Sequence, residues 1–154
     1  MSKHVTISPE EAADRLAIQE LIEAYAHCAD RRDAKAQMAL FTADTHFVVY
    51  MNAKDPMPSQ ELHSREALAP VFAYLNKYDA TTHFVGQSTI FTLMADRATG
   101  EAYCMAHHVT VEDGKRRLML ASLRYLDTLV KMDGSWLFAE RRLYVDWLEE
   151  RSLS

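Results

Sequence analysis

The chain has 154 residues, of which 49% are apolar and 25% are charged, values typical of a globular domain with a buried core. Its formal net charge of −5 argues against nucleic acid as the main partner, because phosphate binding requires a basic surface. No apolar run approaches the ~20 residues that span a membrane, and the amino-terminal stretch lacks the apolar segment of a signal peptide. Cys28 and Cys104 lie in apolar patterns that suggest no disulfide, so we expect one cytoplasmic domain over residues 1–154 with no membrane partner.

A first helix is predicted to begin at Pro9, which suits the first helical position. Ser8 can cap this helix, and Glu11 can complete a capping box. Apolar residues then recur at helical spacing on one stripe: Ile18, Leu21, Ile22, Tyr25 and Ala29. Asp30 follows this stripe, where a helix presents unpaired carbonyl groups and the negative end of its dipole. A carboxylate works against stability there, which makes Asp30 a candidate for chemistry.

Two further helices and a strand are predicted before residue 80. Asp33 can cap a short helix that continues to about residue 41, and residues 45–51 have the β-branched and aromatic side chains of a strand. Pro56 and Pro58 indicate a loop, after which residues 60–63 can form a short return strand. A third helix is predicted from residue 65 to about 78, and Pro70 should kink or divide it.

Four long strands are predicted in the remainder of the chain, over residues 83–94, 98–112, 117–131 and 136–147. Asp113-Gly114 and Asp133-Gly134 are hairpin turns between them. Three helices followed by such strands indicate the α+β class, with the helices packed on one face of a strongly curved mixed or antiparallel sheet. A cone-shaped α+β barrel of this kind encloses a cavity suited to a small ligand.

Strand alternation predicts which side chains face that cavity. On the first long strand, His83 and Gln87 share a face. On the second, small residues that suit a cavity wall share a face with a histidine: Ala102, Cys104, Ala106 and His108. His107 then points outward with the bulkier residues. Alternation alone does not choose between Arg141 and Arg142 on the last strand. The other histidines are expected on the surface or in loops: His4, His27, His46 and His63.

The order of these elements resembles the SnoaL-like branch of the nuclear transport factor 2-like superfamily over nearly the whole chain. The family's first helix is similar to Asp14-Arg-Leu-Ala-Ile-Gln-Glu-Leu-Ile-Glu-Ala-Tyr-Ala-His-Cys-Ala-Asp30. Its final hairpin is similar to Tyr125-x-Asp127-x-Leu129-x-Lys131-x-Asp133-Gly134-x-Trp136. The superfamily includes dehydratases, dehydrochlorinases, isomerases, cyclases, oxygenase subunits and binding modules, so the resemblance is specific to fold and much less to function.

Within the family, the pattern resembles scytalone dehydratase, bile-acid 7α-dehydratase and hexachlorocyclohexane dehydrochlorinase. This resemblance implies four catalytic residues: Asp30, His83, His108 and Tyr25. The dehydrochlorinase has an arginine that falls on Arg141. Where the bile-acid enzyme has an aspartate, this chain has Ala106, which speaks against bile acids as substrates. The residues predicted to contact the substrate are Gln87, Cys104, Ala106 and Arg141.

We expect Asp30 to accept the N–H of His83 and so to strengthen it as a base, while Tyr25 or His108 donates a hydrogen bond or proton. The predicted reaction is elimination of water, or a related isomerisation or cyclisation, on a small apolar carbonyl compound. The sequence contains no phosphate-binding loop, no zinc spacing and no nucleophile elbow, so we expect neither a metal nor a cofactor.

Other readings of the same residues remain open. Asp30 can cap the following helix or pair with Arg31 or Arg32, His83 can be an ordinary strand-start histidine, and Tyr25 can belong to the core. The whole chain can then be a non-catalytic binding or dimerisation module, or the small subunit of a ring-hydroxylating oxygenase. The resemblance also implies a homodimer or a higher homo-oligomer.

Overall fold

The computed structural model describes residues 7–154, so the amino-terminal stretch with His4 lies outside the described residues. Its helices are α1 (Pro9–Arg31), α2 (Ala34–Met38) and α3 (Ala69–Ala73), with 3₁₀ turns η1 (Glu66–Leu68) and η2 (Tyr74–Lys77) on either side of α3. Its strands are β1 (Phe41–Tyr50), β2 (Gln60–Leu62), β3 (Ala80–Leu93), β4 (Arg97–Glu112), β5 (Lys115–Met132) and β6 (Ser135–Leu153). None of the helices within residues 7–154 has the length and apolar character needed to cross a bilayer.

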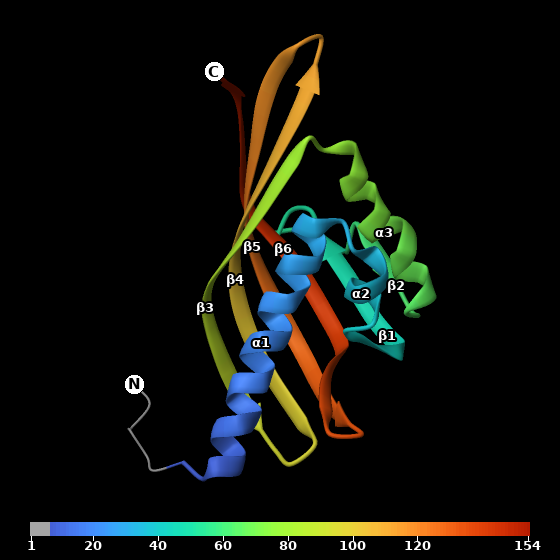
Figure 1. Cartoon of the computed structure of the whole chain (residues 1–154), viewed down its shortest axis with the longest axis vertical. Helices are drawn as coiled ribbons and strands as arrows, with labels where there is room; N and C mark the ends of the chain where they lie inside the picture. Colours follow the sequence, from blue (N-terminus) through green and yellow to red (C-terminus); the bar gives the residue numbers. More distant parts are fainter. Residues whose placement is uncertain (1–6) are drawn as a thin grey trace.

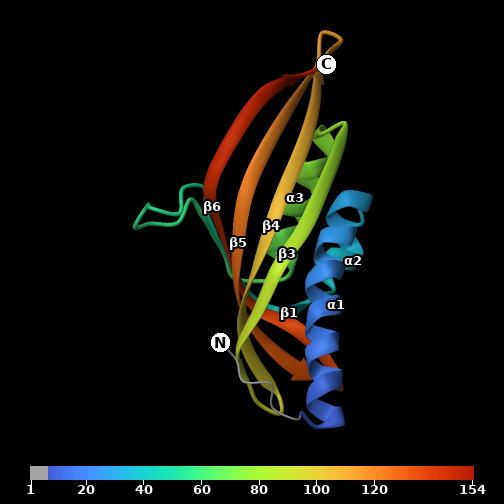
Figure 2. The ribbon, with the colours of Figure 1, turned by 90° about the vertical axis from the view of Figure 1, so that its left-hand side faces the viewer.

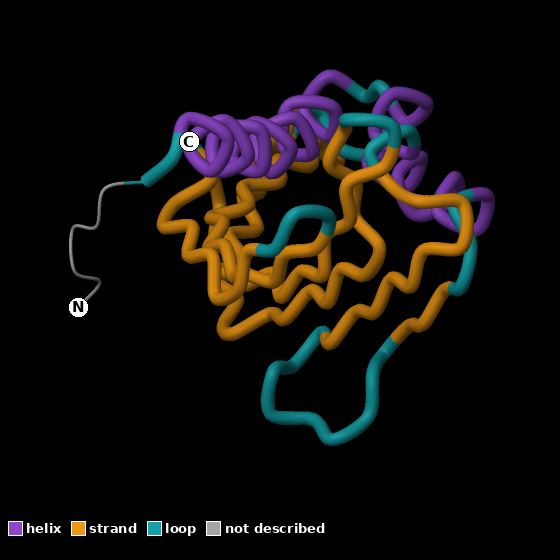
Figure 3. The backbone as a smooth tube through the Cα atoms, turned by 90° about the horizontal axis from the view of Figure 1, so that it is seen from below, coloured by secondary structure: helices purple, strands orange, loops and turns teal. Residues whose placement is uncertain are grey.

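The six strands form one mixed sheet in the order β2-β1-β6-β5-β4-β3. All neighbouring pairs are antiparallel except β1 and β6, which run parallel. The three helices lie on the concave side of this sheet (Figure 1, Figure 2). Seen end-on, the sheet is curled but not closed, because its edge strands β2 and β3 do not pair with each other (Figure 3). The predicted α+β class is confirmed, with an open cone in place of a closed barrel.

Capping side chains and Asp-Gly turns set the ends of several helices and strands, as predicted. The Ser8 hydroxyl accepts the N–H of Glu11 at 3.1 Å, and Asp33 caps α2 through the N–H of Ala36 at 3.0 Å. Both residues of each Asp-Gly turn have positive φ, 50° and 73° at Asp113-Gly114 and 50° and 80° at Asp133-Gly134. Positive φ at both central positions matches the twist of an antiparallel hairpin, which is why glycine is favoured there.

Two of the following boundaries differ from the prediction, and one division follows it. The second helix ends at Met38, and Phe41 begins β1 instead, because its fully buried ring packs against Phe138 of β6. As predicted, the third helix is divided near Pro70, into the 3₁₀ turn η1 and then α3, since proline disrupts a continuing α-helix. β6 continues to Leu153, where it still pairs with Arg116 of β5.

The core lies between α1 and the concave face of the sheet. Its centre is an aromatic cluster in which the Tyr25 ring meets four others edge-on at centroid distances of 5.7–6.1 Å: Phe41, Phe72, Tyr125 and Phe138. Edge-to-face packing of this kind stabilises a core beyond simple burial of area. The cluster anchors the middle of α1 and thereby sets where the carboxyl end of the helix meets β3.

Candidate active site

A cavity of about 220 Å³ opens between the helices and the concave face of the sheet. Among the described residues, its lining contains no Asp, Glu, Lys or Arg and is mostly aliphatic and aromatic. Side chains from α1, β1, α3, β5 and β6 form this apolar wall: Tyr25, Phe47, Val71, Leu123 and Val145 are examples. Two histidines, His83 of β3 and His108 of β4, also line it. A mainly apolar pocket with a few converging polar groups is the usual form of a small-molecule site.

Asp30 and His83 are held together at this cavity by hydrogen bonds to both carboxylate oxygens. Asp30 Oδ1 lies 2.8 Å from His83 Nδ1, and the His83 backbone N–H donates to Oδ2 at 2.9 Å. The Thr81 hydroxyl donates a further hydrogen bond to Oδ1 at 2.9 Å. Since the carboxylate faces Nδ1, the ring nitrogen left for another partner is Nε2. The side chain of His83 is 8% exposed.

Arg32 stabilises the helix end that carries Asp30. It ends α1 in the left-handed conformation with φ 60°, and its guanidinium donates to the carbonyl of Ala29 at 2.8 Å. The same nitrogen donates to the Thr81 hydroxyl at 2.7 Å, so a chain of hydrogen bonds runs from Arg32 through Thr81 to Asp30. A cation at a helix carboxyl terminus offsets the dipole that opposes the Asp30 carboxylate. Sequence reasoning missed Thr81, although its position two residues before His83 on a strand places both on one face.

The surroundings of Asp30 and His108 set the charges of these two side chains. Burial works to raise the pKa of Asp30, but the hydrogen bonds from the His83 ring, the His83 backbone and Thr81 outweigh it and lower that pKa. For His108, burial and, to a lesser extent, the neighbouring His83 lower the pKa to about 4. At neutral pH the site therefore combines an ionised Asp30 with an uncharged His108.

The His108 ring lies across the cavity wall from His83. The two rings meet edge to face with centroids 5.4 Å apart, and the Tyr78 ring lies 4.6 Å from His108. His108 Nδ1 is buried and has no hydrogen-bond partner among the described residues. His107 points away from the cavity, with Nδ1 3.3 Å from the carbonyl of Thr82. Sequence reasoning also missed Tyr78, which no motif marks.

Tyr25 lies both in the core and on the cavity wall. Its ring belongs to the aromatic core, and the residue also lines the cavity. Burial raises the pKa of its hydroxyl to about 12, so the hydroxyl keeps its proton at neutral pH. The group can donate a hydrogen bond to a bound molecule, and it is a weak acid.

Three residues predicted to contact the substrate lie elsewhere. Gln87 is exposed and outside the cavity lining, because a bulge between Val85 and Ser88 breaks the alternation of β3. Cys104 and Ala106 are buried in the core, but neither lines the cavity. The cavity meets β4 at His108, and its wall continues on β5 and β6 instead.

Arg141 faces inward and forms a buried ion pair with Asp127, while its Nη1 has no hydrogen-bond partner among the described residues. Its guanidinium donates two hydrogen bonds of 2.8 Å to Asp127, and it stacks 4.0 Å from the Tyr125 ring centroid and 4.3 Å from that of Tyr25. It does not line the cavity. Arg142 points outward and donates to Glu140 at 2.8 Å. The structure thus places Arg141 beneath Tyr25, outside the cavity lining.

The chain has a counterpart among known families. The sequence model of the SnoaL-like domain family matches residues 10–142 of this chain. The chain belongs to the SnoaL-like domain family. No curated protein sequence matches it.

Solved structures share the fold of this SnoaL-like domain at low sequence identity. A candidate scytalone dehydratase from Novosphingobium aromaticivorans has a TM-score of 0.79 at 19% identity, over 96% of this chain and 94% of that one. A type 2 hexachlorocyclohexane dehydrochlorinase has a TM-score of 0.72 at 18% identity, over 94% and 92%. The β subunit of a candidate aromatic-ring-hydroxylating dioxygenase from N. aromaticivorans has a TM-score of 0.72 at 23% identity, over 90% and 93%. These three neighbours thus carry different names, a dehydratase, a dehydrochlorinase and a dioxygenase subunit, on one shared fold.

Proposed function

We propose that this SnoaL-like domain is an enzyme that carries out acid–base chemistry on a small, mainly apolar carbonyl compound. The reaction is elimination of water or another leaving group, or a related isomerisation or cyclisation. The observation that carries the proposal is the hydrogen-bonded Asp30–His83 pair on the wall of an apolar cavity. Elimination is also the reaction named for two structural neighbours, the dehydratase and the dehydrochlorinase.

His83 is the proposed base. Its Nδ1–H donates to Asp30, so Nε2 carries the lone pair and accepts the proton next to the substrate carbonyl. Asp30 then stabilises the imidazolium that forms. The double attachment of the carboxylate to the ring and the backbone of His83 keeps the imidazole in one orientation during this step.

Tyr25 and His108 are the proposed partners of the oxygen on which negative charge develops. The neutral Tyr25 hydroxyl donates a hydrogen bond to this oxyanion. His108 is uncharged at neutral pH, so it takes part as a hydrogen-bonding imidazole and not as a cation. No charged side chain within residues 7–154 lines the cavity, so a substrate that carries a formal charge fits this pocket less well than a neutral ketone or aldehyde.

Exchange of α-hydrogens tests the step that elimination, isomerisation and cyclisation share. Small apolar ketones such as cyclohexanone are incubated with the protein in D2O, and deuterium uptake is followed by mass spectrometry. We expect uptake above the buffer rate with wild-type protein and a loss of about 10²–10⁴-fold in His83→Ala. His107→Ala, on the outer side of the same sheet, is the matched control and should exchange at the wild-type rate. Equal uptake by the wild-type protein and His83→Ala contradicts the proposal.

The competing function is a non-catalytic role such as that of the dioxygenase β subunit. A subunit of this kind copurifies with a large iron-containing partner, whereas an independent enzyme exchanges α-hydrogens alone. A binding module needs an apolar cavity but not a carboxylate-oriented histidine within it. The Asp30–His83 pair therefore favours catalysis.

A homodimer is the proposed assembly. The outer face of the sheet carries aromatic side chains that are largely exposed in the single chain, including Phe84 and Tyr103. Sedimentation analysis should give twice the mass of the chain, and Phe84→Glu should lower it to that of one copy.

A further inference from the structure

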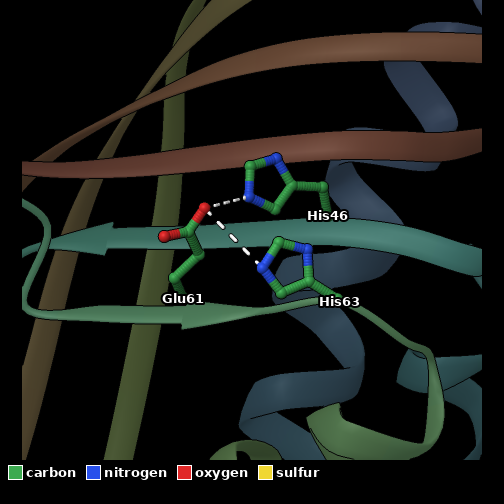
Figure 4. A group of neighbouring side chains, drawn as sticks. All are labelled: His46, Glu61 and His63. Carbon is green, nitrogen blue, oxygen red and sulfur yellow. Dashed lines mark hydrogen bonds and ion pairs between the residues drawn. The ribbon is translucent and has the colours of Figure 1, made fainter.

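A second group of side chains with metal-ligand chemistry lies on the opposite side of β1 from the cavity. His46 Nε2 lies 2.7 Å from Glu61 Oε1, and His63 Nε2 lies 3.8 Å from the same oxygen. One ligand atom from each of the three residues fits within 4.8 Å of the other two. Figure 4 shows the two imidazoles and the carboxylate converging at the edge of the sheet. None of the three lines the proposed active site.

The register of the sheet brings these residues together from separate segments. Phe47 pairs with Leu62, so continuing the antiparallel register by one residue places His63 opposite His46. The two imidazole rings stack with centroids 4.7 Å apart. Glu61, two residues before His63, shares the same face of the hairpin. Phe47 lines the cavity, so its neighbour His46 points to the outer face.

A fourth residue orients His46. Glu140 of β6 pairs with His46 in the parallel register, and its Oε2 lies 2.6 Å from His46 Nδ1. This contact leaves His46 Nε2 aimed at Glu61. A carboxylate on one imidazole nitrogen, with the other nitrogen directed at a ligand position, is the arrangement that surrounds histidines bound to zinc.

We propose that His46, Glu61 and His63 form a binding site for a divalent transition metal ion, with Zn²⁺ as the best fit. Two imidazole nitrogens and one carboxylate oxygen are a ligand set that zinc accepts in tetrahedral sites with a fourth position open to water. Tetrahedral ligand atoms around zinc lie about 3.3 Å apart, given bonds of ~2.0–2.1 Å. Closing the separations of this group to that value requires rotation of Glu61 and of the His63 ring out of its stack with His46. The side chains of Glu61 and His63 are 45% and 73% exposed, so both have room to turn.

The metal-free alternative is a protonated His46 held between two carboxylates. The Glu140 hydrogen bond raises the pKa of His46 most, and the Glu61 hydrogen bond adds to it. That arrangement accounts for His46, whereas His63 keeps only its stack on His46 and a 3.8 Å approach of its Nε2 to the shared carboxylate oxygen. The convergence of a second imidazole on the same oxygen favours a metal ion over a proton.

Bound metal would link the edge of the sheet to its second strand. β2 has three residues and pairs only with β1. A metal ion bridging His46 to Glu61 and His63 fastens both ends of the connection that contains residues 51–59. Met51 in this connection lines the mouth of the cavity, so the site stabilises one wall of the pocket without taking part in its chemistry.

Isothermal titration of the tag-free protein with ZnCl₂ at pH 7.5 tests the site. We expect one Zn²⁺ per chain in the wild-type protein and at least tenfold weaker binding in His46→Ala and in His63→Ala. Glu140→Gln should weaken binding by about tenfold, because it removes the orienting carboxylate and not a ligand. His27→Ala, an exposed histidine on α1, is the matched control and should bind like the wild type. Co²⁺ bound in place of Zn²⁺ should give the visible spectrum of tetrahedral coordination.

A His83→Ala variant separates this site from the proposed active site. Retention of full Zn²⁺ affinity in His83→Ala, together with its loss in His63→Ala, supports the proposal whether or not the domain is an enzyme. Loss of affinity in His83→Ala with full affinity in His63→Ala assigns the ion to the cavity and overturns the proposal. Absence of Zn²⁺ binding by the wild-type protein overturns it as well. Circular dichroism of each variant verifies that the fold is retained.

Discussion

Asp30 and His83 are joined twice, once through the imidazole Nδ1 at 2.8 Å and once through the backbone N–H at 2.9 Å. The second bond anchors the carboxylate to β3 itself, so the carboxyl end of α1 and the start of β3 are positioned by the same group. A side chain that only capped a helix would not need the ring contact. The pair therefore links the fold to the proposed chemistry.

Replacing Asp30 by Asn should reduce α-hydrogen exchange by about 10²–10⁴-fold while the protein stays folded. The amide keeps the size of the side chain but removes its charge, so it no longer stabilises the imidazolium of His83. Deuterium uptake measures the effect, and circular dichroism checks the fold. Thr81→Val removes one hydrogen bond to the carboxylate and serves as the graded control, with a smaller loss. Wild-type uptake in Asp30→Asn would rule out the orienting role.

Folding stability should fall as the pH decreases from about 6.5 to 4, and His108 should account for part of the loss. Its folded pKa is about 4 against an ordinary 6.5. Between these values the unfolded chain binds a proton at this residue and the folded chain does not, so protons favour unfolding. The linkage amounts to about 3 kcal/mol for this residue. Urea denaturation across this pH range should show a flatter profile in His108→Asn, and the same slope as wild type in His27→Ala.

Removing only one member of the buried Arg141–Asp127 ion pair should destabilise the protein more than replacing both members by apolar residues. Arg141→Met leaves the Asp127 carboxylate buried without a counter-charge and should lower the free energy of unfolding by about 3–5 kcal/mol. In the double variant Arg141→Met with Asp127→Leu, both charges are gone, so most of that loss should be recovered. Urea denaturation measures both effects. A double variant that is no more stable than Arg141→Met would contradict this account.

Gly100 should not tolerate a methyl group. A Cβ there would lie 2.7 Å from the backbone carbonyl oxygen of Thr89 on the paired strand, so one strand must shift. Gly100→Ala should therefore destabilise the protein by about 1–3 kcal/mol, the usual range for overpacking. Gly86→Ala is the matched control, because its Cβ would lie 3.6 Å from Tyr103 Cβ, an ordinary contact. Thermal unfolding should separate the two variants, and equal melting temperatures would disprove the explanation.

The sequence by itself determined the features that depend on neighbouring residues. Caps at Ser8 and Asp33 and the two Asp-Gly turns follow local rules of hydrogen bonding and backbone conformation. The division of the third helix at Pro70 follows from the missing N–H of proline. The odd position of a carboxylate at the end of α1 also marked Asp30 before any partner was known.

Tertiary structure alone decided what depends on register and curvature. A bulge in β3 points Gln87 away from the cavity. Cys104 and Ala106 lie in the core outside the cavity lining, and Arg141 forms an ion pair with Asp127. The pairing of β1 with β2 gathered His46, Glu61 and His63, and its pairing with β6 added Glu140, a grouping that no sequence spacing marks. Side-chain alternation predicts a face only while a strand stays regular, and contacts between distant segments depend on which strands pair. For that reason the sequence and its family resemblance could pair Asp30 with His83, whereas the bond from the His83 backbone N–H and the support from Thr81 and Arg32 required the folded chain.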